Sequence, residues 1–201
     1  MIPARWLWGI GLGLLVCLAP ARHLSAQEMD LTPADQVSVL GRILAFDRSF
    51  AARADDGLVV GILYQRGYRP SLLAHNDVRT ATAAIKGGIL GSGEVRLVSI
   101  DASSGADLQK ELRDGEVDLL YVAPMRAQDV REVARVTTAL RIPTFTGVRD
   151  YMVAGLGIGV GQRGGRPEIL VNLEATRSQG MDLNAQFLRV VTMIKPDDGI
   201  E

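Results

Sequence analysis

Apolar runs and stretches of helical periodicity alternate along residues 32–148. The runs are nearly continuous, as in strands buried on both faces of a sheet, and cover 58–64, 95–100, 117–123 and 142–148. Apolar positions recur at helical spacing in 32–52, 71–86, 104–113 and 127–140. Alternating helices and strands predict an α/β fold, a three-layer sandwich in which helices flank a mostly parallel sheet.

The pattern changes in the last third of the chain. Residues 156–161 and 168–173 are short apolar segments separated by a stretch with two adjacent glycines, which predicts a β-hairpin. A closing helix is predicted over 183–194, followed by a loose tail over 195–201. We therefore expect a single domain over residues 32–194.

Residues 1–26 have the features of a secretory signal peptide. Arg5 precedes an apolar run over 6–21, and small residues up to Ala26 lead into polar sequence. The run is shorter than the roughly 20 residues of a membrane-spanning helix, and Pro20 interrupts it. Cleavage after Ala26 is therefore favoured over an uncleaved anchor, and we expect a soluble protein in the periplasm.

Composition constrains the mature chain further. Removing 26 of 201 residues leaves 175, enough for one domain with a hydrophobic core. The removed segment carries Arg5 and Arg22 and no acid, leaving 20 basic against 23 acidic residues, a charge of −3. This balance does not favour nucleic acid as a partner. Cys17 is the only cysteine, so the mature chain has none for a disulfide. Val16 before it is not small, which disfavours lipid attachment there.

Few motifs indicate catalysis or a cofactor. Alternating glycines over 155–161 superficially match a phosphate loop, but such a loop opens a helix, whereas these lead into a hairpin. Glycine at period two favours close packing on one sheet face instead. His75, the only histidine after residue 26, lies among polar residues, and we expect it to be solvent-exposed. Carboxylate pairs at 55–56 and 197–198 fall in turn or tail sequence. We expect no catalytic residue, no metal, no cofactor and no enzymatic activity.

Polar residues follow each predicted strand. In parallel α/β sheets, small molecules bind beyond the carboxyl ends of the strands. The candidate ligand or partner contacts at these ends are Arg66, Asp101, Ser104, Arg126 and Asp150. The alternative is that they are ordinary polar loop residues.

The C-terminal third contains a predicted hairpin, an N-L-x-A stretch and a closing helix, and the residues that mark them are Gly157, Ile169, Asn172, Ala175 and Gly180. In order and spacing, these features resemble the YfiR family of bacterial periplasmic proteins. Residues 43–47 and 58–63 are similar to the opening helix and first strand, so the resemblance covers about 37–194. It departs at 47–50, where many members carry Trp-Pro, and in having no cysteine after residue 26.

The resemblance implies a role in regulation. Such proteins are similar to a periplasmic repressor of an inner-membrane diguanylate cyclase, the enzyme that makes cyclic-di-GMP, and the domain also occurs beside sensor kinases and receptors. Our first hypothesis is a non-catalytic periplasmic regulator or adaptor that binds a membrane-bound signalling protein through an exposed apolar patch. The alternative is a periplasmic small-molecule binding module feeding a sensor kinase or transporter. The oligomeric state stays open, a dimer included.

Overall fold

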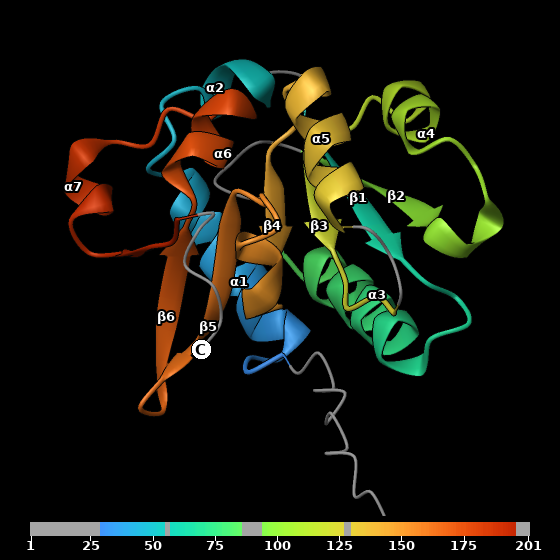
Figure 1. The fold of residues 1–201 in the computed structure, drawn as a ribbon, viewed down its shortest axis with the longest axis horizontal. Coiled ribbons are helices and arrows are strands. Elements are labelled where there is room, and N and C mark those ends of the chain that lie inside the picture. Colours follow the sequence, from blue (N-terminus) through green and yellow to red (C-terminus); the bar gives the residue numbers. More distant parts are fainter. Residues whose placement is uncertain (1–28, 55–56, 86–93, 127–129, 196–201) are drawn as a thin grey trace, which may run out of the picture.

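The computed structural model describes residues 29–54, 57–85, 94–126 and 130–195, which form one sheet covered by helices (Figure 1). The strand order is β2-β1-β3-β4-β5-β6-β7. The strands are β1 (Leu58–Tyr64), β2 (Val95–Asp101), β3 (Leu119–Val122), β4 (Thr144–Thr146), β5 (Ile158–Arg163), β6 (Arg166–Val171) and β7 (Thr192–Met193). Neighbouring strands pair in parallel except β5 and β6, which are antiparallel.

Helices cover both faces of the sheet. They are α1 (Pro33–Leu44), α2 (Phe50–Arg53), α3 (Arg69–Ala83), α4 (Leu108–Asp114), α5 (Val130–Leu140), α6 (Leu173–Ser178) and α7 (Ala185–Leu188), with 3-10 turns η2 (Ala102–Ser104) and η3 (Arg149–Met152). Within the described ranges, no helix combines the length and apolar character needed to cross a membrane. The predicted signal peptide, its cleavage site at Ala26, the pairs at 55–56 and 197–198, and residues 196–201 of the tail lie outside the described residues.

Two hydrophobic clusters lie on opposite faces of the sheet. On β1, Ile62 packs in the cluster with α1 and α3, whereas Leu63 packs in the cluster with α4 and α5. Tyr121 and Leu120 on β3 divide in the same way. Each fully buried aliphatic side chain of this kind contributes about 1.5–3 kcal/mol through the hydrophobic effect. This arrangement confirms the predicted α/β fold with a mostly parallel sheet between two helical layers.

Two helix boundaries predicted in the first half of the domain are wrong. The helix expected over 32–52 begins as predicted, with Thr32 accepting from the Asp35 N–H at 3.2 Å, but it ends at Leu44. The Asp47 side chain binds the Ser49 N–H at 3.0 Å, and such local bonds compete with helix continuation.

The second wrong boundary lies near residue 104. The helix expected to start there begins instead at Leu108, because Asp107 accepts from the N–H groups of Gln109 and Lys110 and caps it. Ser104 lies in η2, whose C-cap is Gly105.

The C-terminal part combines a confirmed hairpin with a shorter closing helix. Strands β5 and β6 turn at the predicted glycines, Gly164 and Gly165. The helix expected over 183–194 is only the four-residue α7, and β7 follows it. The β-branched stretch at 190–192 favours extended backbone, and the Ile194 N–H donates to the Val171 carbonyl at 2.9 Å.

The residues of the family pattern have structural roles. A Cβ on Gly157 would lie 2.7 Å from Gln179 Oε1, and one on Gly159 would lie 2.7 Å from Met152 Sδ. This close approach agrees with the packing predicted for the alternating glycines. Asn172 caps α6 by accepting from the Ala175 N–H at 3.0 Å.

The other two residues of the family pattern, Ile169 and Gly180, lie before and after Asn172 in the sequence. Ile169 lies on β6 opposite Val160. Gly180 follows α6 with a φ of +89°, a conformation that favours glycine.

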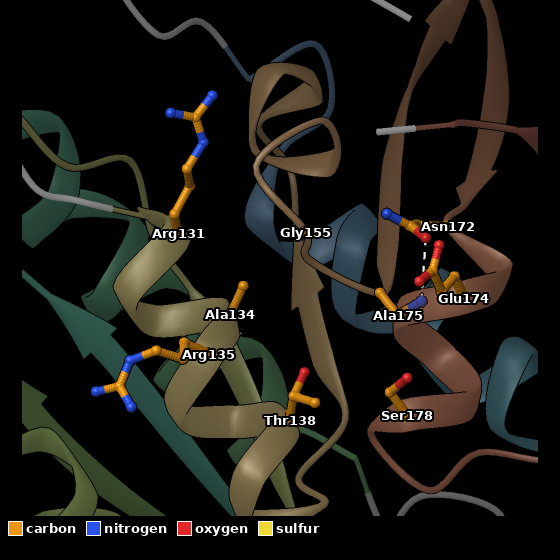
Figure 2. A pocket seen from close by; sticks show the side chains of 9 residues that line it. All are labelled: Arg131, Ala134, Arg135, Thr138, Gly155, Asn172, Glu174, Ala175 and Ser178. Atoms are coloured by element: carbon orange, nitrogen blue, oxygen red, sulfur yellow. Dashed lines mark hydrogen bonds between the residues drawn. The ribbon is translucent and has the colours of Figure 1, made fainter. Parts of the chain in front are cut away.

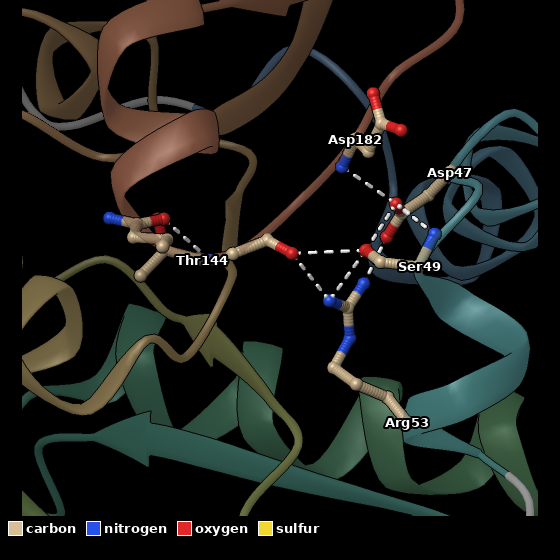
Figure 3. A network of polar contacts seen from close by, with 7 residues as sticks. Asp47, Ser49, Arg53, Thr144 and Asp182 are labelled. Carbon is tan, nitrogen blue, oxygen red and sulfur yellow. Dashed lines mark hydrogen bonds and ion pairs between the residues drawn. The ribbon is translucent and has the colours of Figure 1, made fainter.

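A polar clasp joins the turn after α1 to the segment after α6 (Figure 3). The Asp47 side chain is fully buried and accepts from the N–H of Asp182 at 2.9 Å and from the Ser49 hydroxyl at 2.7 Å. It also pairs with the Arg53 guanidinium, which donates to the Gly180 carbonyl at 2.9 Å. The clasp satisfies a buried carboxylate with several donors and fixes both ends of the domain to each other.

Candidate functional site

A half-enclosed cavity lies beyond the carboxyl ends of β1 and β2. Its volume is about 320 Å³, within the range of small-molecule sites. Apolar side chains from the strand ends, the η2–α4 segment and α5 make up most of its walls: Leu63, Ile100, Ala102, Ala106, Leu108, Val133 and Val136. The strand topology thus places a cavity at the edge where α/β sheets bind ligands.

Among the described residues that line the cavity, three carboxylates are the ionisable groups: Asp101, Asp107 and Glu132. Glu132 pairs with Arg135 one turn along α5, with 2.7 Å from Arg135 Nε to Glu132 Oε2. Asp107 uses Oδ1 to cap α4, at 2.9 Å from the Gln109 N–H. Two of these residues, Asp107 and Glu132, were not among the candidates predicted from sequence. The run Asp-Leu-x-x-Glu at 107–111 has the pattern of a helix N-terminus and could have located Asp107 at the rim.

Arg66 and Asp101 form an ion pair at the edge of this cavity. Arg66 Nε lies 3.0 Å from Asp101 Oδ2, and the Arg66 backbone N–H donates to Asp101 Oδ1 at 3.2 Å. Partial burial alone would raise the pKa of Asp101, but the Ser103 N–H and both donors of Arg66 hold it below its usual value. The hydrogen bond to Asp101 correspondingly raises the pKa of Arg66. Asp101 is therefore ionised at neutral pH and turned toward Arg66.

Arg126 lies at the point where the strand order reverses between β1 and β3. Its backbone N–H donates to Gln65 Oε1 at 2.6 Å, and its carbonyl accepts from Gln65 Nε2 at 2.9 Å. Its guanidinium carbon stands 4.9 Å from the centre of the Tyr68 ring. Gln65 therefore links the ends of the two strands.

The other two predicted site residues, Ser104 and Asp150, form no hydrogen bond or ion pair with the first three among the contacts of the described residues. The Ser104 hydroxyl accepts from the Ala106 N–H at 3.2 Å, which places Ser104 beside the cavity wall. Asp150 is exposed in η3, after β4, and none of the contacts among the described residues joins it to the other candidates. The structure thus brings Arg66 and Asp101 into direct contact and leaves Asp150 apart.

The prediction that His75 is solvent-exposed is wrong, because the residue is buried. Its ring stacks on Tyr64 with centroids 4.1 Å apart, and Nε2 lies 2.8 Å from the Ser99 hydroxyl. Desolvation lowers the pKa of His75 below its ordinary value, with Arg79 adding to the effect and the hydrogen bond to Asn76 opposing it. Its polar sequence neighbours concealed this, because His75 lies on the face of α3 that packs against the sheet.

A second hollow lies between α5 and α6 (Figure 2). It is an open groove of about 360 Å³, and the small residues Ala134, Gly155 and Ala175 are among those that line it. The side chains of Arg131 and Arg135 point away from α6 in this view. The groove offers little enclosure for a small molecule, so the cavity at the strand ends is the better candidate. Among the described residues, no group of three His, Cys, Asp or Glu side chains is placed to hold a metal ion.

Comparison with known proteins identifies the fold but not a family. No family model and no curated protein matches the chain. Among solved structures, a conserved domain protein from Vibrio cholerae matches with a TM-score of 0.58 at 16% identity, over 83% of this chain and 61% of that one.

Two further structures are of a domain in complex with L-Trp and of a substrate binding protein. An ABC domain in complex with L-Trp from Streptococcus pneumonia matches with a TM-score of 0.56 at 11% identity, over 81% of this chain and 62% of that one. The ligand-free, open structure of CD0873, a substrate binding protein with adhesive properties from Clostridium difficile, matches with a TM-score of 0.54 at 14% identity, over 82% and 60%. This chain therefore spans about three fifths of the length of each, and the likeness is one of fold.

Proposed function

We propose that this chain is a small-molecule-binding module that acts after export, in the periplasm. The observation that carries the proposal is the half-enclosed cavity at the carboxyl ends of β1 and β2. Apolar walls with a few charged groups are typical of sites that bind small organic ligands. The substrate-binding protein and the L-Trp complex that share the fold support the same function, and they support export as well.

The proposal is tested by measuring the thermal stability of the purified domain against a broad panel of small metabolites. A ligand that binds only the folded state raises the midpoint of unfolding, and the shift grows with the logarithm of the ligand concentration above its Kd. Ala106→Trp fills the cavity from its rim, whereas Ser178→Trp places the same side chain in the α5–α6 groove. We expect Ala106→Trp to abolish the stabilisation and Ser178→Trp to retain it. A panel without a single stabilising compound, or the reverse response of the two variants, would contradict the proposal.

The regulatory hypothesis remains a second candidate because of an exposed apolar corner. Val190 is 79% exposed, and Phe46 and Met193 are also exposed. The Phe46 ring stacks on Phe187, to whose carbonyl the Val190 N–H donates, so Phe46 and Val190 belong to one region. Apolar surface of this kind favours contact with another protein.

The second candidate is tested in the native host. If this corner binds a membrane-bound signalling protein, Val190→Asp changes the cellular level of cyclic-di-GMP or the output of a sensor kinase. Leu73→Asp, which alters another exposed apolar side chain, on α3, is the control. An identical output in the wild type and in both variants would count against this function.

A further inference from the structure

We infer that the cavity at the ends of β1 and β2 selects an apolar molecule bearing a cationic amine and rejects free carboxylates, amino acids included. This inference rests on the proposed function and specifies the ligand class of that same site. It follows from the composition of the cavity lining, which combines apolar walls with carboxylates and, within the described part of the chain, includes no basic side chain.

The apolar walls determine which kind of chemical group can form the main part of the ligand. Seven of the ten lining residues are aliphatic, and they come from both strand ends, the η2–α4 segment and α5. Burial of apolar surface in such a cavity contributes to affinity in proportion to the area removed from water. A small aromatic or branched aliphatic group therefore fits this part of the cavity.

The cations near the cavity are already paired and do not line it. Arg66 is held by Asp101, and Arg135 is held by Glu132. Lys110 pairs with Asp114 one turn along α4. A ligand carboxylate entering the cavity would thus leave water without gaining an opposite charge, which is unfavourable.

Asp107 offers the available acceptor for an ammonium group. Its Oδ1 accepts from the N–H groups of Gln109 and Lys110. Within the described part of the chain, no donor is hydrogen-bonded to Oδ2. An ammonium group can bind this oxygen through a charge-assisted hydrogen bond while its apolar body occupies the cavity. Asp101 and Glu132 on the same lining are each paired with an arginine, whereas no ion pair among the described residues holds Asp107, which therefore supplies the negative charge that favours a cation.

The test compares three ligands that share one body: phenethylamine, phenylalanine and 3-phenylpropionate. Binding to the purified domain is measured by isothermal titration at constant ionic strength. We expect phenethylamine to bind at least about tenfold more tightly than the other two, since charge-assisted contacts are the stronger hydrogen bonds. Equal or tighter binding of phenylalanine or 3-phenylpropionate would overturn the inference.

Two variants locate the charge that recognises the amine. Asp107→Asn removes the charge and keeps a residue that caps helices equally well, so α4 should still form. Asp114→Asn removes the same charge from α4 outside the cavity lining. We expect Asp107→Asn to weaken phenethylamine binding about two- to fivefold, as for a partly exposed charge pair, and Asp114→Asn to leave it unchanged. Equal effects of the two variants would contradict a role for Asp107.

This experiment is separable from the test of the proposed function. If none of the three ligands binds, the amine inference fails, whereas the broad metabolite panel still decides whether the cavity binds small molecules. If a carboxylate from that panel binds and Ala106→Trp prevents it, the module is confirmed and the inferred ligand class is wrong.

Discussion

Oδ1 of Asp47 accepts the backbone N–H of Asp182 at 2.9 Å, which joins two segments separated by 135 residues. The Asp47 side chain has no solvent exposure, and its partner Arg53 is only 19% exposed. Because the Asp182 donor is a backbone group, the Asp182 side chain is not needed for this bond. Substitutions of Asp47 and of Asp182 can therefore measure the contribution of the Asp47 carboxylate to stability separately from that of the Asp182 side chain.

Replacing Asp47 should strongly destabilise the domain. Asp47→Ala removes the acceptor and leaves the partly buried guanidinium of Arg53 without its carboxylate, so we expect a loss of about 3–5 kcal/mol in the free energy of unfolding. Asp182→Ala breaks only a solvent-exposed ion pair with Arg48 and should cost at most about 1 kcal/mol. Urea denaturation of both variants measures the difference, and similar losses would contradict the role assigned to Asp47.

Gly157 should not tolerate a side chain. A Cβ there would meet Gln179 Oε1 at 2.7 Å, and this buried oxygen also accepts from the N–H and hydroxyl of Thr144 at 3.0 and 2.9 Å. Gly157→Ala is expected to cost about 1–3 kcal/mol, as for other overpacked sites. Gly67→Ala is the matched control, because nothing lies within 4 Å of the position that its Cβ would take. Chemical denaturation distinguishes them, and a neutral Gly157→Ala would refute the packing argument.

The hydroxyl of Tyr121 should contribute to stability through Gln36. Tyr121 donates to Gln36 Oε1 at 2.8 Å, and both side chains are buried. Tyr121→Phe leaves that oxygen without its donor, which is expected to cost about 1–3 kcal/mol. Burial raises the pKa of Tyr121, so its hydroxyl stays protonated at neutral pH. A variant as stable as the wild type in thermal unfolding would show that water replaces the lost donor.

His75 should make stability depend on pH. Its folded-state pKa lies below the ordinary value of about 6.5, so the unfolded chain binds more protons between those two values. The stabilisation from neutral His75 is therefore complete above about pH 6.5 and is lost as the pH falls toward the folded-state pKa. His75→Gln should flatten this part of the curve. Denaturation at a series of pH values measures it, and an unchanged slope in the variant would assign the dependence to other groups.

Strands could be predicted from the sequence where their apolar pattern matched burial on both faces of the sheet. Residues 58–64 are uniformly apolar because β1 is covered by helices on each side, and the paired glycines fixed the hairpin turn. The cavity was harder to predict, since its walls come from distant elements and their apolar residues resemble any core residues. Its position at the strand ends was the part that topology alone indicated.

Predictions from local sequence were wrong at positions where a contact distant in sequence determined the structure. His75 has polar neighbours in sequence but stacks on Tyr64 in space. Ser104 and Asp107 are both good capping residues, and the turn at Gly105, with a φ of +71°, leaves Asp107 at the start of α4. The segment after α7 became a strand because β6 offered backbone partners at the sheet edge.

The clasp around Asp47 also limits how early the domain can finish folding while the chain is being synthesised. Its acceptor lies near the start of the chain, and its backbone donor at Asp182 lies near the end, so closure waits for almost the whole sequence. Contacts this distant in sequence are slow to form because the intervening chain must first be ordered. Until then, the Asp47 carboxylate has only the nearby donors of Ser49 and Arg53, and the turn after α1 is not yet joined to the segment after α6.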